Sequence, residues 1–394
     1  MPWSLRMTLI TAGLMTVFLL YISSRYFWSV RMTNLQPQWA LHGGMVGLIL
    51  LFWIYPGWSL ITYYAGYTYS LHDFAPWMKY LFWYGFVFAG VMLSWTLLLD
   101  ITAAVIKFGF KVNPPQLNTF LGWAMISITV LVLVYTGLKI IWDTHRIKHI
   151  DVSYSMAEHG IEDMEPFRII HISDLHADKY TLENKTDRYV QMVQKANPDL
   201  VFFTGDLVTA GMEFIESGAD ALFKIEATYG TFAVLGDHDY WSGADEITHA
   251  LEERGIRVLR DENHWIEHAG EQIKLTGFTE IYSTRPESEI IDRLMAEDRG
   301  EKMRILFSHQ ASERLIEKAL EENVHQLLAG HTHGGQIRIP FFFYPMTASL
   351  METRYIRRDS WLGSTLLNVN SGLGFTLAPI RYNAPAEVTV IDVR

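Results

Sequence analysis

Five short apolar runs in the C-terminal part of the chain each end in an acid or a histidine. The runs occupy residues 168–173, 200–204, 231–235, 304–308 and 326–329. Runs of this length that are rich in Ile, Val and Phe are typical of buried β-strands. In open α/β sheets, ligands bind beyond the carboxyl ends of the strands. One sheet could therefore present to a single point the side chains that follow these runs: Asp174, His176, Asp206, Asp237, His309, His331 and His333.

A convergence of carboxylates and imidazoles predicts a site for two metal ions. The chain has no Cys, which excludes disulfides, thiolate zinc sites and cysteine nucleophiles. A phosphate ester is an anion that repels hydroxide, and two metal ions about 3.5–4 Å apart can neutralise it and activate water. Asp and His supply the oxygen and imidazole ligands that such ions need. The chain therefore has the residues for a two-metal site of the kind that such chemistry needs.

The charge is distributed unevenly along the chain. Residues 1–143 hold seven Lys and Arg and three Asp, and the first Glu is Glu158. The net charge of −11 therefore divides into +4 for this part and −15 for the remainder. Because a nucleic-acid-binding protein needs a basic surface, we do not expect nucleic acid as a partner.

Four stretches of the first part are long and apolar enough to cross a bilayer, which takes about 20 residues per helix. They cover residues 9–28, 45–64, 77–99 and 120–142, with Trp and Tyr near their ends. The alternative is a set of buried helices in a large soluble domain, but such a domain rarely lacks Glu over 157 residues. The pattern favours a multi-pass protein of the cell (inner) membrane, with the lipid bilayer as a partner.

The side of the membrane that carries the C-terminal domain is not decided by charge. An even number of spans places both ends of the chain on one side, and basic residues mark the cytoplasmic side. Four basic residues flank the spans on each side, and Lys139, near the end of the last span, is the only further one. It favours a cytoplasmic catalytic domain.

The expected domains are a four-helix transmembrane region (1–143), a polar linker (144–165) and a C-terminal domain (166–394). Residues 182–195 have helical spacing and lie between two of the predicted strands. Strand, helix and strand in this order form a βαβ unit, which builds a parallel or mixed sheet. The fold class is therefore α/β.

Five motifs occur in an order that resembles a known family. They are Asp174-Leu-His176, Gly205-Asp206, Gly236-Asp-His-Asp239, His309 and Gly330-His-Thr-His333. From residue 167 to the C-terminus the chain resembles the calcineurin-like metallophosphoesterases. Residues 330–336 (GHTHGGQ), 370–374 (NSGLG) and 379–381 (PIR) resemble the membrane-associated branch, which includes phosphodiesterases similar to UDP-2,3-diacylglucosamine hydrolase. The resemblance implies a two-sheet αββα sandwich.

The same resemblance implies how two divalent ions (Mn²⁺, Fe²⁺/³⁺ or Zn²⁺) would be held. One ion would be bound by Asp174, His176 and His333. The second would be bound by Asp237, His309 and His331, and Asp206 would bridge the two. A metal-bridging hydroxide would attack the phosphorus atom.

The resemblance also implies two catalytic residues beside the metals. His238 would lie outside the coordination sphere and face the leaving group, where it would stabilise charge or donate a proton. The usual imidazole pKa, close to neutrality, suits that task. Asp239 would orient and charge the imidazole of His238.

Asp237 departs from the family pattern, which usually has Asn at this position. Its carboxylate can still bind metal, and its extra charge should tighten metal binding while weakening Lewis acidity. We therefore expect an Asp237→Asn variant to keep activity.

An aromatic stretch follows the last ligand motif. Residues 340–346 (PFFFYPM) precede Arg354, Arg357 and Arg358. Aromatic residues beside basic ones suit a lip that meets acyl chains and lipid phosphates. A core strand followed by a solvated loop fits the sequence equally well.

The function predicted from the sequence is hydrolysis of a phosphodiester, pyrophosphate or phosphomonoester bond. The anchor favours a phosphorylated substrate that is lipid-linked or membrane-proximal. Two alternatives remain. One is a tethered phosphatase of soluble nucleotides or phosphoproteins, and the other is a metal-binding membrane receptor without enzymatic activity. Because pure ligand binding needs no proton donor, His238 favours an enzyme.

Overall fold

The computed structural model describes residues 1–66, 75–110, 115–181 and 183–394, which form two compact units. The first unit contains Met1–Thr144, Ile337–Thr347 and Leu377–Asn383. The second contains His145–Gln336, Ala348–Thr376 and Ala384–Arg394. The sequence analysis assigned residues 337–347 and 377–383 to the C-terminal domain. They belong instead to the first unit, because Ile339, Ile380 and Tyr382 join the apolar cluster of its helices.

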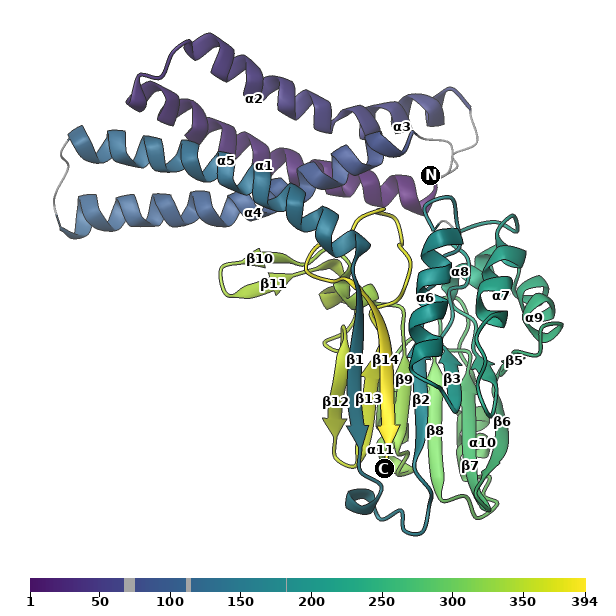
Figure 1. Cartoon of the computed structure of the whole chain (residues 1–394). Coiled ribbons are helices and arrows are strands. Elements are labelled where there is room, and N and C mark those ends of the chain that lie inside the picture. The colour runs from purple at the N-terminus through teal and green to yellow at the C-terminus, as the bar shows by residue number, and fades with distance from the viewer. Residues whose placement is uncertain (67–74, 111–114, 182) are drawn as a thin grey trace. The chain divides into compact units, whose positions relative to one another are not determined.

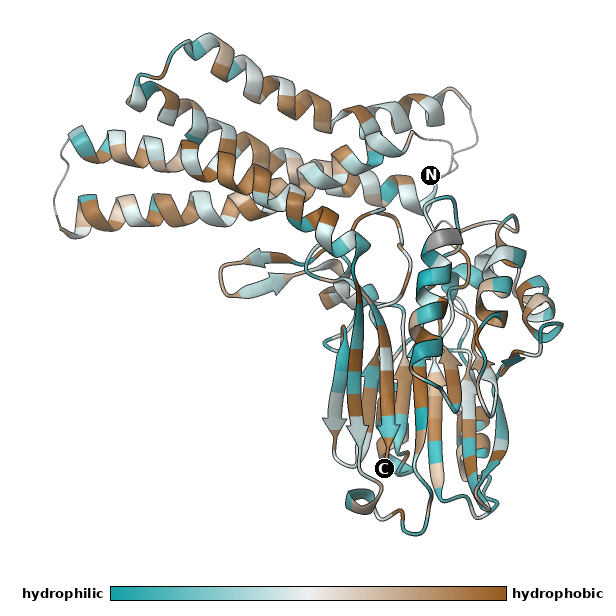
Figure 2. Ribbon diagram, in the orientation of Figure 1, coloured by the Kyte–Doolittle hydropathy of each residue, from teal (hydrophilic) through white to brown (hydrophobic). Residues whose placement is uncertain are grey.

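The first unit consists mainly of apolar helices (Figures 1 and 2). Its helices are α1 (Trp3–Thr33), α2 (Gln38–Phe52), α3 (Ile54–Tyr64), α4 (Pro76–Ala104), the π-helix η1 (Val105–Gly109) and α5 (Pro115–His145). Within the described ranges, α1, α4 extended by η1, and α5 are long and apolar enough to cross a membrane. Helices α2 and α3 are bent by 41° and add a fourth candidate if they form one span. The structure thus contains three or four candidate spans where the sequence predicted four.

The bend between α2 and α3 divides the predicted span 45–64 near Trp53. Pro56, in the first turn of α3, has no backbone N–H to donate to the carbonyl of Phe52 four residues earlier. The proline ring also clashes with that carbonyl in a regular helix. One residue therefore explains why a continuous apolar stretch forms two helices.

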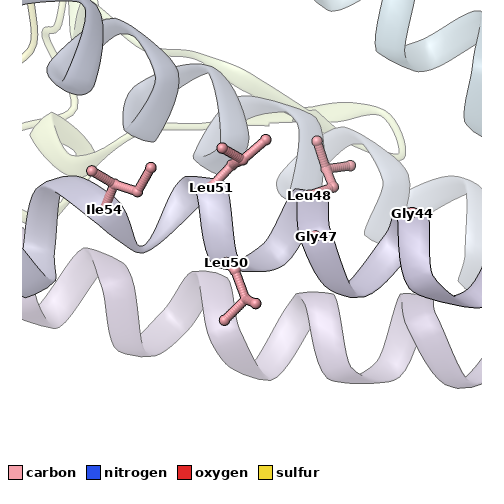
Figure 3. A pocket seen from close by; sticks show the side chains of 6 residues that line it. All are labelled: Gly44, Gly47, Leu48, Leu50, Leu51 and Ile54. Carbon is pink, nitrogen blue, oxygen red and sulfur yellow. The ribbon is translucent and has the colours of Figure 1, made fainter.

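An open apolar groove lies on α2, with a volume of about 550 Å³. Figure 3 shows the six residues that line it: Gly44, Gly47, Leu48, Leu50, Leu51 and Ile54. None of them carries a titratable or metal-binding group. The groove therefore offers contact surface and no catalytic chemistry.

The second unit contains two six-stranded sheets (Figure 1). The first has the order β1 (Ile147–Tyr154), β14 (Ala386–Val393), β2 (Phe167–Ile172), β3 (Leu200–Phe203), β4 (Thr231–Ala233) and β5 (Arg257–Val258). The second has the order β12 (Arg358–Leu362), β13 (Thr365–Val369), β9 (Gln326–Ala329), β8 (Met303–Ser308), β7 (Glu271–Phe278) and β6 (Glu262–His268).

Both sheets are mixed, which confirms the predicted α/β class. Strands β2 to β5 are parallel neighbours, and β14 runs antiparallel to β2. In the second sheet β7, β8, β9 and β13 are parallel, while β6 and β12 are antiparallel edge strands. The expectation that one sheet presents all the ligands was wrong. Strands β2, β3 and β4 belong to one sheet and β8 and β9 to the other, and the apolar content of a run does not reveal which sheet it joins.

The predicted linker 144–165 also needs correction, because strand β1 lies within it. Strand β1 pairs in parallel with β14, from Ile147 opposite Ala386 to Tyr154 opposite Val393. Val152 and Tyr154 are buried while Ser153 between them is exposed. This alternation is typical of a strand with one buried face, and the charged residues around it concealed it.

The remaining helices cover the sheets or lie in their connections. They are α6 (Glu183–Lys195), α7 (Ile215–Phe223), α8 (Asp237–Ser242), α9 (Ala244–Glu252), α10 (Ser288–Ala296), α11 (Glu313–Glu321) and the 3₁₀ turns η2 (Ala157–His159), η3 (His333–Gly335) and η4 (Ala348–Met351). Helix α6 confirms the predicted βαβ unit between β2 and β3.

Three apolar clusters hold the second unit together. Residues of α6, α7 and α9 pack with one face of the first sheet, and residues of α10 and α11 pack with the second sheet. The third cluster takes residues from both sheets, including Phe202 of β3 and Phe307 of β8. Their ring centroids lie 4.9 Å apart. This cluster joins the strands that carry the candidate site.

We predict that Phe202→Ala lowers the free energy of unfolding by about 3–5 kcal/mol, because it opens a cavity in this cluster. Urea unfolding of the full-length protein in detergent would measure the loss. Phe223→Ala is the matched control, since Phe223 is exposed on α7, and it should change stability by less than about 0.5 kcal/mol. Equal losses in the two variants would contradict this view of the core.

Candidate metal centre

The seven predicted ligands follow the carboxyl ends of five strands from both sheets. Asp174 and His176 follow β2, Asp206 follows β3, and Asp237 follows β4. In the second sheet, His309 follows β8, and His331 and His333 follow β9. All seven are buried except His331, which is partly exposed. The structure thus brings together at one place residues that span 160 positions of the chain.

Most of these residues have a left-handed backbone, which is rare outside Gly. The φ angles are 50° at Asp174, 46° at His176, 58° at Asp206, 70° at His331 and 51° at His333. Each such residue costs on the order of 1–3 kcal/mol and persists only when its surroundings impose it. Strain concentrated at one group of side chains indicates a functional site.

Two motif glycines allow the loops to approach closely. A Cβ at Gly330 would lie 1.8 Å from Ser173 Oγ. A Cβ at Gly374 would lie 2.2 Å from the carbonyl oxygen of Leu175. Because any side chain at either position would displace the loop that carries Asp174, these glycines are needed for packing.

The ligand atoms form overlapping groups of three whose atoms lie within 4.8 Å of one another. The first group is Asp174, His176 and His333, and the second is Asp237, His309 and His331. Asp206 joins two more such groups, one with His176 and His238 and one with Asp174 and His309. His176 Nε2 and His333 Nε2 are 3.1 Å apart, and His309 Nε2 and His331 Nδ1 are 3.2 Å apart. The first two groups have the same members as the two ligand sets that the resemblance implied. His238, which the resemblance placed outside the coordination sphere, lies close enough to His176 and Asp206 to form a group with them.

Asp206 lies between the two groups. Its Oδ2 atom is 3.4 Å from His176 Nε2 in the first group and 3.4 Å from His309 Nε2 in the second. Its Oδ1 atom accepts the backbone N–H of His238 at 2.8 Å. One carboxylate oxygen thus faces both groups, as a bridging ligand would.

The chemistry of the donor atoms fits divalent cations. The Asp174 Oδ1 atom is buried and has no hydrogen-bond donor among the residues that the structure describes, and it lies 3.4 Å from His333 Nε2. His309 Nδ1 faces the carbonyl of Thr204 at 2.7 Å, which leaves Nε2 directed into the cluster. A buried acceptor and paired ring nitrogens are costly unless a cation lies between them.

The pKa shifts of Asp206 and His309 show that buried acids surround the site with negative charge. Burial alone would raise the pKa of Asp206, but His309 and His238 hold it well below its usual range. Burial alone would lower the pKa of His309, but Asp206, Asp174 and Asp237 raise it well above its usual range. The acids therefore call for positive charge, which metal ions would supply.

His238 and Asp239 are close to the centre, but they do not interact as predicted. The His238 Nδ1 atom lies 2.5 Å from the carbonyl of Thr209, and Nε2 lies 3.4 Å from Thr376 Oγ1. The carboxylate of Asp239 accepts the backbone N–H groups of Asp206, Leu207, Val208 and Gly236. Its predicted bond to the His238 imidazole is wrong, because an acid in the first turn of α8 points back to cap the helix. Asp239 instead holds the loop of Asp206.

Asp237 also makes hydrogen bonds that explain an acid at this position. Its Oδ1 atom accepts the backbone N–H of Tyr282 at 2.8 Å. Its Oδ2 atom accepts the side-chain N–H of Gln310 at 2.7 Å and lies 3.3 Å from His331 Nδ1. Both carboxylate oxygens of Asp237 accept hydrogen bonds. If Asn replaced Asp237, its side-chain NH₂ group would face either one of these N–H donors or the metal.

The sequence analysis missed three residues around the second group. Besides Gln310, the Tyr282 hydroxyl and Glu352 Oε2 each lie 3.1 Å from His331 Nε2. A carboxylate on the distal nitrogen of a metal-binding imidazole fixes its orientation and raises its basicity. Glu352 and Tyr282 lie in loops far from the ligand motifs, and no local pattern identifies them.

Two polar residues near the ligands have structural roles. His171 is a buried core histidine between Asn368 and Thr204, and burial lowers its pKa to about 4. Asn370 donates to the carbonyl of His171 and to Thr389 Oγ1. It joins β13 to the first sheet behind the ligands.

Comparisons with known proteins agree with this geometry. A family model described as calcineurin-like phosphoesterase matches residues 167–335. Metallophosphoesterase YkuE of Bacillus subtilis is 30% identical over 254 residues, which are 62% of this chain and 83% of the relative. The chain belongs to the calcineurin-like metallophosphoesterases. As such it is a metal-dependent phosphoric ester hydrolase, and the family uses divalent metal ions.

Two further relatives of this metallophosphoesterase have more specific names, one for an activity and one for a membrane location. Phosphodiesterase YaeI of Escherichia coli is 26% identical over 236 residues, 58% of this chain and 82% of the relative. A zebrafish (Danio rerio) protein named transmembrane protein with metallophosphoesterase domain is 26% identical over 285 residues, 68% of this chain and 62% of the relative. Together with the apolar helices, the second relative indicates membrane association.

We predict that Asp237→Asn keeps activity at saturating metal but needs more metal to reach it. The variant loses one acceptor that Tyr282 or Gln310 requires and one negative charge at the metal. Removing a partner of this kind typically costs 10–100-fold in metal affinity, and we expect about tenfold. Titration of metal-depleted protein with Mn²⁺ while activity is followed would measure it. Asp359→Asn, an exposed acid on β12, is the matched control.

We also predict that Glu352→Ala weakens metal binding by about 10–100-fold, because the His331 imidazole loses the carboxylate that orients it. Glu352→Gln keeps an acceptor and should lose less. Metal content after dialysis against graded chelator would rank the variants. If Glu352→Ala retained metal as the unaltered protein does, the contact with His331 would have no bearing on the site.

Proposed function

We propose that this protein is a membrane-anchored phosphoesterase with a dinuclear metal centre. It hydrolyses a phosphodiester, pyrophosphate or phosphomonoester bond in a lipid-linked or membrane-proximal substrate. The observation that carries the proposal is the position of Asp206 Oδ2, 3.4 Å from a histidine of each ligand group. A carboxylate shared in this way suits two ions within about 4 Å of each other.

The metal ions, when bound, would neutralise the phosphate oxygens and activate a water molecule. The protein groups around them have separate tasks. The carbonyl of Thr209 accepts from His238 Nδ1–H, which fixes the orientation of the ring and directs Nε2 away from this carbonyl. The His238 Nε2 atom can then give its proton to the leaving oxygen. Asp239 keeps the Asp206 loop in place beneath it.

The anchor supports a substrate at the bilayer. The candidate spans of the first unit would place the second unit at the membrane surface, where lipids are at high local concentration. We infer a multi-pass protein of the inner membrane, with Lys139 favouring the cytoplasmic side. We also infer that the two sheets pack face to face as an αββα sandwich, which is supported by the apolar cluster that they share.

We predict metal-dependent hydrolysis of an aryl phosphodiester by the full-length protein in detergent. Activity should appear with Mn²⁺ and disappear on chelation. His238→Ala should lower kcat by about 10²–10⁴-fold, the range for general acid–base catalysis. His249→Ala, an exposed histidine on α9, is its control. Asp206→Asn should lose both metal and activity.

The substrate class needs a second comparison. If the substrate is lipid-linked, an aryl phosphodiester that carries a long acyl chain should be hydrolysed faster than its soluble analogue. Equal rates would favour the tethered phosphatase of soluble substrates. Metal binding without hydrolysis of any phosphate ester would refute the enzymatic proposal.

A further inference from the structure

The aromatic stretch after the last ligand motif forms a β-hairpin in the first unit. Strands β10 (Ile339–Phe341) and β11 (Tyr344–Met346) pair antiparallel, and Phe342 and Phe343 form the turn. Phe343 is fully exposed, and Phe341, Phe342, Tyr344 and Met346 are all exposed by more than a third. These side chains do not form a core strand. In water they would be a large apolar patch on a segment of eight residues.

The hairpin packs against the middle of helix α4. Gly90 is fourteen residues from Pro76 and fourteen from Ala104, so it marks the midpoint of the helix. A Cβ at Gly90 would lie 2.6 Å from Ile339 Cδ1, which shows that the glycine makes room for this side chain. Ser94 Oγ donates to the carbonyl of Pro340 at 3.2 Å. If α4 crosses the bilayer, the base of the hairpin lies at the depth of the hydrocarbon.

Two prolines lower the cost of placing the backbone of the hairpin in hydrocarbon. Exposed backbone N–H groups are costly there, and open sheet edges are normally excluded. Pro340 pairs with Pro345, and neither has an N–H group, so theirs is the pair without mutual hydrogen bonds. At this pair the backbone groups point outward, away from the partner strand. The two prolines therefore remove both outward donors, and Ser94 satisfies the outward carbonyl of Pro340.

Short segments of chain join the hairpin to residues of the metal centre. Five residues separate the ligand His333 from Ile339, and five separate Met346 from Glu352, which contacts His331. Six steps of extended chain cover at most about 20 Å. Chain length alone therefore limits the distance from Ile339 to the ligand His333 to about 20 Å.

We propose that the β10–β11 hairpin lies in the hydrocarbon of the bilayer and that its aromatic side chains bind acyl chains of membrane lipids. It acts as the subsite of the phosphoesterase that binds the acyl chains of a lipid-linked substrate. The inference rests on the proposed membrane anchoring and deepens the proposed substrate class. The binding chemistry is apolar, so it selects acyl chains rather than a particular head group.

The absence of cysteine allows a direct test with single-cysteine variants. Phe343→Cys reports on the hairpin. Leu131→Cys, an exposed position in the middle of α5, reports on the span, and Phe223→Cys reports on the exposed surface of the second unit. Each full-length variant would carry a polarity-sensitive fluorophore in vesicles of phosphatidylcholine and phosphatidylglycerol. Brominated acyl chains quench a label in lipid, and iodide quenches a label in water.

We expect the Phe343 label to lose fluorescence with brominated lipid, as the Leu131 label does, and the Phe223 label to respond only to iodide. A Phe343 label that behaves like the Phe223 label overturns the inference. So does a Phe343 label shielded from both quenchers, which would indicate a protein partner or a second copy of this chain. If the Leu131 label also responds only to iodide, the proposed anchoring itself fails, which separates the two failures.

The subsite makes a second prediction about activity. The double variant Phe342→Ser, Phe343→Ser should lower hydrolysis of an acyl-chain aryl phosphodiester in these vesicles by at least about tenfold, because two aromatic contacts with the acyl chain are lost. Hydrolysis of the soluble aryl phosphodiester should be unchanged, which also controls for folding. Equal losses on both substrates, or no loss on either, would overturn the subsite. If the unaltered protein hydrolyses neither substrate, the proposed function fails instead.

Discussion

The carboxylate of Asp206 is the interaction on which the rest of the site depends. It stands between a histidine that follows a strand of the first sheet and one that follows a strand of the second. The two sheets therefore have to meet at their carboxyl ends for either ligand group to be complete. The apolar cluster that contains Phe202 and Phe307 holds the strands together directly behind these loops. Core packing and metal binding therefore both require that the two sheets meet at the carboxyl ends of these strands.

Without cations the site is high in free energy, and contacts with the rest of the fold hold it in place. Left-handed backbones, buried acids and facing imidazole nitrogens all raise its free energy in the absence of cations. Close backbone contacts at Gly330 and Gly374 and the hydrogen bonds accepted by Asp239 keep the loops from relaxing. Divalent ions would relieve most of the electrostatic cost. This explains why the family motifs contain glycines and an acid that do not themselves bind metal.

The two units are more closely interwoven in sequence than a separate anchor and enzyme would be. The chain passes between them five times, at 144/145, 336/337, 347/348, 376/377 and 383/384. Two of these crossings lie close to contacts with a ligand or with His238: 347/348 precedes Glu352, which contacts His331, and 376/377 adjoins Thr376, which contacts His238. The two units are therefore joined covalently at several points of the sequence, and two of these points are close to residues of the metal centre.

The sequence by itself determined the candidate spans, the strands and the types of ligand that follow them, because these depend on local apolar patterning and on the chemistry of each side chain. Only the tertiary structure decided that two sheets share the ligands and that Asp239 holds a loop rather than His238. It likewise supplied Glu352, Tyr282 and Gln310, and placed the aromatic hairpin on α4. The physical reason is that these features are contacts between residues far apart in the chain. A local pattern records the tendency to be buried, but not the partner against which a residue is buried.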